Sequence, residues 1–200
     1  MTRLVFRGRI AGVGSTSGTR VVVGHWPESP YGEFGDAMVE TATGHRVLLA
    51  PSEEVRDLVA ATYRFDEVRL ERFTIDPGPE GWHVHSASLE LDIRFGGRTA
   101  LGRVLRLVPG RVAESAGWCT VTDPFARVLL RGVRTRGSAG GGRREWYGAT
   151  DVHRVSSLVG HFDGAGLGAL ADVTPSTRFG FSSTPRKPSV TTVVTTVETA

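Results

Sequence analysis

Apolar and polar residues alternate with a period of two along much of the chain. The segment 89–95 alternates strictly between apolar and charged residues. Successive side chains of a β-strand point to opposite faces, so this pattern predicts a strand with one buried and one solvated face. The residues expected to line a shared interior are Phe6, Leu89, Leu91, Ile93 and Phe95.

Turn residues and β-branched runs predict further strands. The stretch 37–50 is typical of a hairpin in which Thr43 and Gly44 form the turn between two apolar runs. Valine and threonine make up almost all of 189–198, and their branched side chains favour a pleated backbone. The other predicted strands are 19–24, 67–71, 132–136, 144–155, 158–162 and 177–182.

Short helices are expected between the strands. Ser52 is suited to cap a helix at 53–62, because its hydroxyl oxygen accepts a backbone N–H of the first turn. An apolar stripe predicts a second helix at 99–108, and Asp123 followed by Pro124 is typical of the start of a third. The whole chain is therefore predicted to form one all-β or β-rich α+β domain. Its expected architecture is a mostly antiparallel barrel or bent sheet with two to three short helices.

Composition narrows the expected compartment. The chain has one cysteine, Cys119, which excludes an intramolecular disulfide and favours a reducing compartment. No apolar run approaches the roughly 20 residues that a transmembrane helix needs. These features favour a cytoplasmic protein without a transmembrane segment.

Positive charge is concentrated in one part of the chain. Ten arginines and two acids lie in the stretch from Arg98 to Arg144, whereas fourteen acids and five arginines lie in 28–92. Three interpretations remain open: the two regions pair with each other, the arginines grip a small anion, or a basic helix at 99–108 lies on anionic lipid. Nucleic acid is not an expected partner, because the basic stretch lacks interleaved aromatic residues and the net charge is only +3.

The densest cluster of polar and aromatic residues follows this basic stretch, at 143–148. On an unbroken strand, Glu145, Tyr147, Asp151 and His153 share one face. Two carboxyl groups, a phenol and an imidazole on one face are suited to acid–base catalysis in a pocket. The alternative is a solvated strand face, or a buried tyrosine and histidine that bond to neighbouring carboxylates.

Two histidines are the candidates for a metal site. His83 and His85 are two residues apart, so they share a strand face and would point inward if the strand continued unbroken to Leu89. The apolar Trp82 and Val84 favour the opposite orientation, which requires a break near 86–88 and turns the histidines to water. No metal ion or other cofactor is predicted.

Short motifs resemble two protein families. Gly24-His25-Trp26 resembles the Gly-x-Trp motif of lipocalins, Thr150-Asp151-Val152 is similar to their second motif, and Arg178 corresponds to the arginine that closes over the tryptophan. That resemblance implies that these residues pack the closed end of a barrel. The chain, especially 44–51 and 142–148, also resembles an uncharacterised bacterial family, which implies no activity.

A barrel of this size either fills with side chains or encloses one small ligand. The leading hypothesis is a binding protein for a small, partly apolar, anionic molecule. The residues expected to bind its head group are Arg134, Arg136 and Arg144, and those expected to form the walls are Trp26, Trp146 and Tyr147. The alternatives are an enzyme that uses Glu145, Asp151 and His153 in the same cavity, and a protein-interaction module. The oligomeric state is not indicated.

Overall fold

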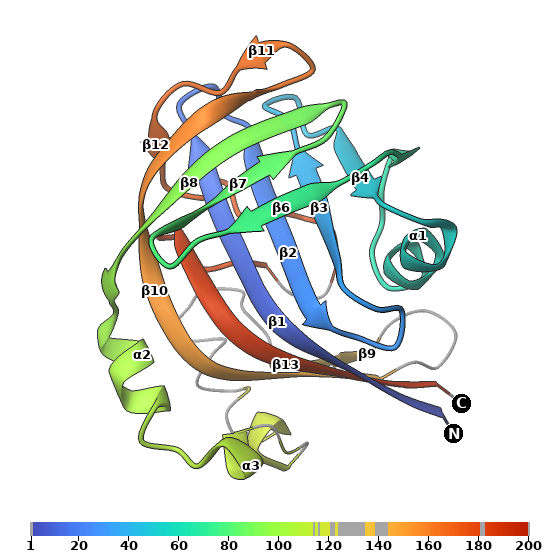
Figure 1. Ribbon diagram of the computed structural model, residues 1–200, viewed down its shortest axis with the longest axis vertical. Coiled ribbons are helices and arrows are strands. Elements are labelled where there is room, and N and C mark those ends of the chain that lie inside the picture. The colour runs from blue at the N-terminus through green and yellow to red at the C-terminus, as the bar shows by residue number, and fades with distance from the viewer. Residues whose placement is uncertain are drawn as a thin grey trace.

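A curled, mostly antiparallel β-sheet in the shape of a half-barrel dominates the protein (Figure 1). The computed structural model describes residues 2–113, 115, 117–120, 123, 135–138, 144–180 and 183–199. Within these residues, ten strands are hydrogen-bonded in the order β5-β4-β3-β2-β1-β13-β10-β8-β7-β6. They are β1 (Thr2–Ser15), β2 (Arg20–Glu28), β3 (Phe34–Glu40), β4 (Arg46–Ala50), β5 (Glu67–Leu70), β6 (Thr74–Pro77), β7 (Gly81–His85), β8 (Leu89–Arg98), β10 (Arg144–Phe162) and β13 (Ser189–Thr199). The predicted β-rich, bent-sheet fold is confirmed.

Three shorter strands pair outside this path. They are β9 (Arg136–Ser138) and β11 (Ala165–Gly166), which pair with β10, and β12 (Leu170–Ala171), which pairs with β1. The prediction of a strand at 177–182 is wrong for its described residues, because 177–180 form an irregular segment. Most of the strand predicted at 132–136 lies outside the described residues.

Short helices accompany the sheet in the part of the chain that the structure describes, among them α1 (Glu53–Ala60), α2 (Ala100–Leu105) and α3 (Gly110–Ala113). Ser52 caps α1 as predicted, because its hydroxyl oxygen accepts the N–H of Val55 at 3.4 Å. The third helix, predicted from Asp123 onward, lies outside the described residues after its first position.

The helix predicted at 99–108 is present in shortened form as α2, with Thr99 as its cap. The buried position of α2 is Gly102, whereas Val104 of its apolar stripe is exposed. A Cβ at Gly102 would lie 2.8 Å from the backbone N of Val152, so the glycine permits the helix to approach β10 closely.

The hydrophobic core fills the curl of the sheet. Strands β8, β7 and β6 cross in front of β1, β2 and β3 (Figure 1), and apolar side chains pack between the two parts. Leu89, Leu91 and Ile93 belong to this core as predicted, and Phe95 packs against it. Phe6 is buried too, but the prediction that it shares the same interior is wrong. It lies with Ile10 on the other face of β1, whereas Ala11 points into the core.

The long strand β10 joins two predicted strands, 144–155 and 158–162, and carries a β-bulge. Gly148 and Ala149 pair with Val194 and Val193, but the next residue of β13 pairs with Asp151, so Thr150 is an extra residue. Because successive side chains alternate between faces, one extra residue exchanges the two faces from Asp151 up to the next extra residue of β10, between Val155 and Ser157.

The sheet stays open, unlike a closed lipocalin barrel. Strands β4 and β5 are parallel, joined by a crossover that contains α1, and the path ends at β5 and β6, which do not pair with each other. Arg178 does not close over Trp26, because its backbone N–H and its Nε donate to Glu40. The lipocalin resemblance therefore does not describe how these residues pack.

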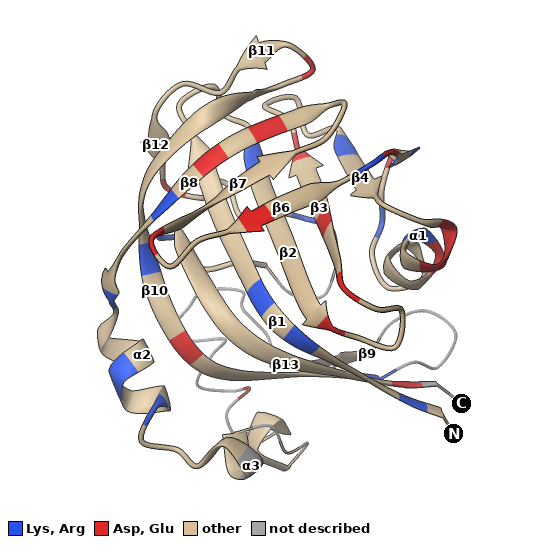
Figure 2. Cartoon of the chain, in the orientation of Figure 1, with Lys and Arg blue, Asp and Glu red and all other residues tan. Residues whose placement is uncertain are grey.

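Charged side chains lie outside the core. Figure 2 shows acidic residues on α1 and β8, and basic residues on α2 and along β1. Among the described arginines between 98 and 144, Arg98 pairs with Asp151 at 2.8 Å and Arg144 with Glu198 at 3.4 Å. These partners lie on β10 and β13, not in 28–92. None of the helices in the described residues has the length and apolar composition needed to cross a bilayer.

Candidate functional site

Two adjoining cavities lie on the face of the sheet opposite the core. The first, which we name the carboxyl cavity, measures about 80 Å³, and the second, the hydroxyl cavity, about 140 Å³. Both exceed the volume of a single water molecule several-fold. The side chains that line both cavities belong to Ile10, Val22, Met38, Tyr63 and Tyr147, so the two cavities meet along one wall.

Alternation along the strands explains why these residues face the cavities. In β1, β2 and β3, the cross-strand neighbours Ile10, Gly24 and Asp36 form one row on the cavity face. The residues between them in sequence, such as Val23 and Ala37, point into the core. Both faces of these strands are therefore covered, one by the core and the other by α1 and by residues from 177–179 and 183–185.

A chain of hydrogen bonds crosses the wall that the cavities share. The hydroxyl of Thr62, just after α1, donates to Glu145 Oε1 at 2.7 Å, and the Tyr147 hydroxyl donates to Glu145 Oε2 at 2.8 Å. The hydroxyl groups of Tyr63 and Tyr147 also bond to each other. A phenol carries one proton, so Tyr147, which donates to Glu145, accepts the hydrogen bond from Tyr63.

Burial keeps both tyrosines protonated. Removal from water raises the pKa of Tyr63 and of Tyr147 well above the usual phenol value, and the neighbouring Glu145 carboxylate raises both further. The tyrosine pair is thus a fixed source of hydrogen bonds within an otherwise apolar wall.

Asp36 is the second carboxyl group in the carboxyl cavity and lies apart from this chain. Its Oδ1 accepts a hydrogen bond from the indole N–H of Trp26 at 3.1 Å. Gly24 makes the contact possible, because a Cβ there would collide with both Asp36 Oδ1 and Trp26 Nε1. Burial raises the pKa of Asp36 to about 7, and the indole hydrogen bond only partly opposes that shift.

Buried hydroxyl groups without a hydrogen-bond partner among the described residues also line the cavities. Thr195 Oγ1 lies in the wall of the carboxyl cavity, and Thr184 Oγ1 and Ser189 Oγ lie in the wall of the hydroxyl cavity. A buried polar group without a partner is costly, and native proteins contain few of them. Such groups in a cavity wall are suited to bind water or a ligand.

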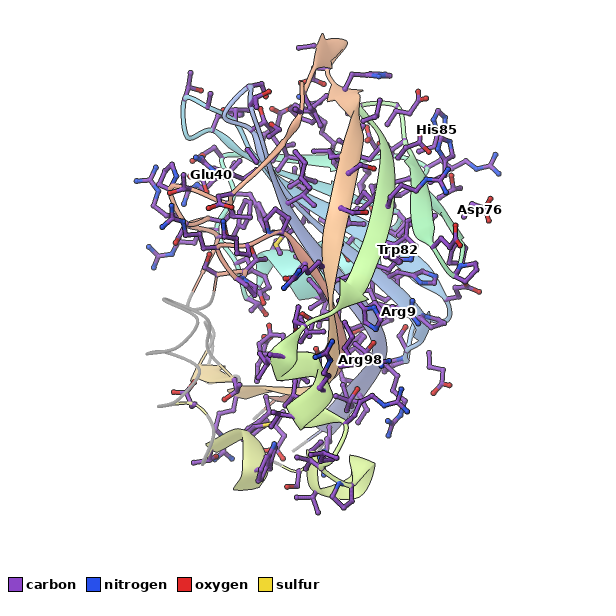
Figure 3. All side chains as sticks on the ribbon, turned by 90° about the vertical axis from the view of Figure 1, so that its left-hand side faces the viewer. Arg9, Glu40, Asp76, Trp82, His85 and Arg98 are labelled. Atoms are coloured by element: carbon purple, nitrogen blue, oxygen red, sulfur yellow. The ribbon has the colours of Figure 1, made fainter. Side chains whose placement is uncertain are left out.

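A buried ion pair fixes one end of the cavity face. Arg20 and Glu40 are joined at 3.1 Å with side chains at most 4% exposed, and Glu40 also binds Arg178 of the segment 177–179, which covers the hydroxyl cavity. Figure 3 shows Glu40 on the opposite side of the molecule from His85 and Asp76 of β7 and β6. The segment that covers the hydroxyl cavity is therefore tied to the sheet.

Four of the six predicted ligand-binding residues, Trp26, Arg144, Trp146 and Tyr147, can be placed relative to the cavities. Trp26 and Tyr147 line the carboxyl cavity, as does the predicted acid–base residue Glu145. Trp146 alternates with Glu145 and Tyr147 and lies on the other face of β10, where the Arg144 guanidinium stacks 5.7 Å from its ring centre.

That Arg134, Arg136 and Arg144 bind the head group of a ligand stays a prediction. Arg134 lies outside the described residues, and the side chain of Arg136 is not described. Arg144 lines neither cavity, since its guanidinium group lies against Trp146 and 3.4 Å from Glu198.

The prediction that Asp151 and His153 share a face with Glu145 is wrong, and the bulge at Thr150 is the reason. Asp151 instead accepts a hydrogen bond from Arg98, and His153 Nδ1 lies 3.3 Å from the carbonyl oxygen of Gly96.

His83 and His85 point away from the core. A turn at 86–88 separates β7 from β8, so Val84 pairs with Leu91 in the core and both histidines are exposed. His83 Nδ1 lies 3.0 Å from Asp92. Among the described residues, no three histidine, cysteine, aspartate or glutamate side chains gather as a metal site requires.

Sequence reasoning missed Asp36, Thr62 and Tyr63. A signal for Asp36 was present, because it shares strand parity with Met38 and Glu40 in a strand whose other face is wholly apolar. Thr62 and Tyr63 follow α1 in an irregular segment, where no periodicity indicates which way a side chain points.

Comparisons with known proteins find similarity in backbone structure but not in sequence. No protein-family model matches the chain, and no curated protein is similar to it in sequence. The crystal structure of acetoacetate decarboxylase from Legionella pneumophila is similar over 100% of this chain and 85% of that chain, with a TM-score of 0.46 and 6% sequence identity. At this level of similarity, nothing about the activity of that protein transfers to this chain.

Proposed function

We propose that the protein binds a small, mainly apolar, uncharged molecule in the carboxyl cavity. The observation that carries the proposal is an apolar cavity that holds the hydrogen-bonded chain Tyr63–Tyr147–Glu145 and the separate carboxyl group of Asp36. Apolar walls with a few fixed polar groups are typical of small-molecule sites.

The ionisable groups in the described lining argue for an uncharged ligand. They are two carboxyl groups and two tyrosines, and no arginine or lysine is among the described lining residues. A bound anion would face the carboxyl groups without a compensating cation, which is costly in a buried site. The tyrosine and threonine hydroxyls are suited to hydroxyl or carbonyl groups instead.

The test follows the NMR signal of one methyl group, that of Met38. Met38 lines both cavities and Met1 is the only other methionine, so protein labelled with ¹³C at the methionine methyls gives two signals. A Met38→Leu variant identifies the relevant one. Cyclohexanone, cyclohexanecarboxylate and cyclohexylammonium are then titrated as probes of similar shape and different charge.

We expect cyclohexanone to shift the Met38 signal saturably, and the carboxylate to bind at least about 10-fold more weakly because its charge would be buried unpaired. Tighter binding of the carboxylate would contradict the proposal and favour the arginine head-group site. Tighter binding of the ammonium probe would reassign the ligand as a cation. If no probe moves the signal, these cavities are not a ligand site.

One observation favours a second candidate function, an enzyme that transfers protons on its bound molecule. Because the pKa of Asp36 is about 7, both its acid and its base forms are populated near neutral pH. An enzyme of this kind would exchange the α-hydrogens of cyclohexanone for deuterium in D₂O, and Asp36→Asn would abolish the exchange without abolishing the Met38 shift. Equal exchange in both proteins would exclude Asp36 as the base.

A further inference from the structure

We infer that the hydroxyl cavity is a second subsite of the same binding site, which takes an uncharged hydroxyl, carbonyl or amide group of an elongated ligand. This inference rests on the proposed function of the carboxyl cavity. It adds a second group of ligand-binding residues, Thr184 and Ser189 in the hydroxyl cavity. These residues indicate the chemical class of the end of the ligand that lies outside the carboxyl cavity.

Two unpartnered hydroxyls gather at one position in the hydroxyl cavity. Ser189 pairs directly with Gly12 across the β1–β13 ladder, and Thr184 lies above Gly12, where a Cβ would come within 2.8 Å of Thr184 Oγ1. The missing side chain at Gly12 therefore leaves room for Thr184 beside Ser189. Ser189 is 5% exposed, and neither hydroxyl has a hydrogen-bond partner among the described residues.

The chemistry of this position selects an uncharged polar group. A hydroxyl donates one hydrogen bond and can accept up to two, so these two hydroxyls can satisfy an amide, a carbonyl or another hydroxyl. The described lining of the hydroxyl cavity contains no aspartate, glutamate, lysine, arginine or histidine that could neutralise a charged group. Apolar side chains, among them Val193 and Phe179, supply the rest of the wall.

The shared wall makes the two cavities one site. Ile10, Val22 and Met38 form the apolar part of that wall, and the bonded tyrosines Tyr63 and Tyr147 form its polar part. A ligand that extends along this wall places an apolar body beside the tyrosine pair and its polar end at Ser189. It then satisfies hydroxyls that are otherwise buried without partners.

The experiment uses two valines that report on the two cavities separately. Val197 lines only the carboxyl cavity and Val193 only the hydroxyl cavity, so ¹³C-methyl labelling of valine follows both in one spectrum. The probes are hexanamide and its charged counterpart hexanoate. The variants are Ser189→Ala and Thr184→Val, and the control is Ser156→Ala, which removes an exposed serine hydroxyl that donates to Arg94 O.

We expect hexanamide to shift both valine signals with one dissociation constant, and hexanoate to bind at least about 10-fold more weakly. Each cavity variant should weaken hexanamide binding about 2- to 10-fold, because one hydrogen bond is lost, and the control should not. The Tm of Ser189→Ala in the absence of ligand should be no lower than that of the wild type, because the substitution removes a buried hydroxyl without a partner.

Four results would overturn the inference. A hexanamide shift confined to Val197 would leave ligand binding in the carboxyl cavity intact but exclude the second subsite. Unchanged affinity in both cavity variants would exclude Ser189 and Thr184 as ligand partners. A Ser189→Ala variant with a clearly lowered Tm would assign the hydroxyl a structural role. If neither valine responds to any probe, the proposed function fails together with the inference.

Discussion

The buried carboxyl group of Asp36 gives the stability of the protein a specific dependence on pH. Its pKa is about 7 in the folded protein, compared with 3.8 for an unperturbed aspartate. Between these two values the folded state holds a proton that the unfolded state has released, so stability falls as the pH rises through this window. One pKa unit corresponds to about 1.4 kcal/mol, and the full shift of roughly three units therefore costs about 4 kcal/mol above pH 7.

Between pH 5 and pH 8 this single group accounts for a loss of about 2.5 kcal/mol in the free energy of unfolding. Asp36→Asn keeps an oxygen that can accept from the Trp26 indole but removes the titration, so its stability should change much less over that range. The assay is guanidinium unfolding at several pH values, followed by circular dichroism. The control is Asp76→Asn, an exposed carboxyl group on β6.

The reasoning would be refuted by a wild-type protein whose stability does not fall between pH 5 and pH 8. It would be refuted equally by an Asp36→Asn variant with the same pH dependence as the wild type. In either case Asp36 would be in contact with enough water to ionise normally.

Two further substitutions test the packing around the site. Gly24→Ala places a methyl group where Trp26 Nε1 and Asp36 Oδ1 meet, so we expect that hydrogen bond to be lost. The loss should change the tryptophan fluorescence and lower the free energy of unfolding in guanidinium by about 1–3 kcal/mol. A variant with wild-type fluorescence and stability would show that the pair does not depend on this glycine. Glu40→Gln leaves the buried Arg20 guanidinium without its carboxylate at 3.1 Å, and we expect a loss of about 3–5 kcal/mol. The exposed Glu53→Gln, which also breaks a pair with an arginine, should change stability little, and similar losses in both would contradict the assigned burial of the Arg20–Glu40 pair.

Patterns within a single element were sufficient to predict much of the fold. The alternation of Leu89, Leu91 and Ile93 identified the core face of β8, and Ser52 identified the first residue of α1, because each signal depends only on neighbours in sequence. The same logic fails where one strand changes register. Nothing in the composition around Thr150 marks it as an extra residue, so Asp151 and His153 were assigned to the face of Glu145.

The candidate site was only partly predictable, because it is assembled from segments far apart in sequence. Glu145 and Tyr147 lie in a polar and aromatic cluster that is recognisable in the sequence, whereas their partners Thr62 and Tyr63 are more than eighty residues away. Only the tertiary structure brings these hydroxyls together. The concentration of arginines in sequence does not mark the cavities, because the described pairs of this stretch, Arg98–Asp151 and Arg144–Glu198, line neither of them.

The crossover between β4 and β5 has a consequence for how a ligand would leave. Leu58 and Val59 of α1, with Thr62 and Tyr63 just after it, form a wall of the carboxyl cavity, yet the only fully buried residue of this two-turn helix is Val55. Elements with few buried contacts detach from a protein at far lower free energy than the whole fold requires. We therefore expect the residence time of a bound molecule to depend on how firmly Val55 docks against Leu48 and Ala50, while the sheet remains intact.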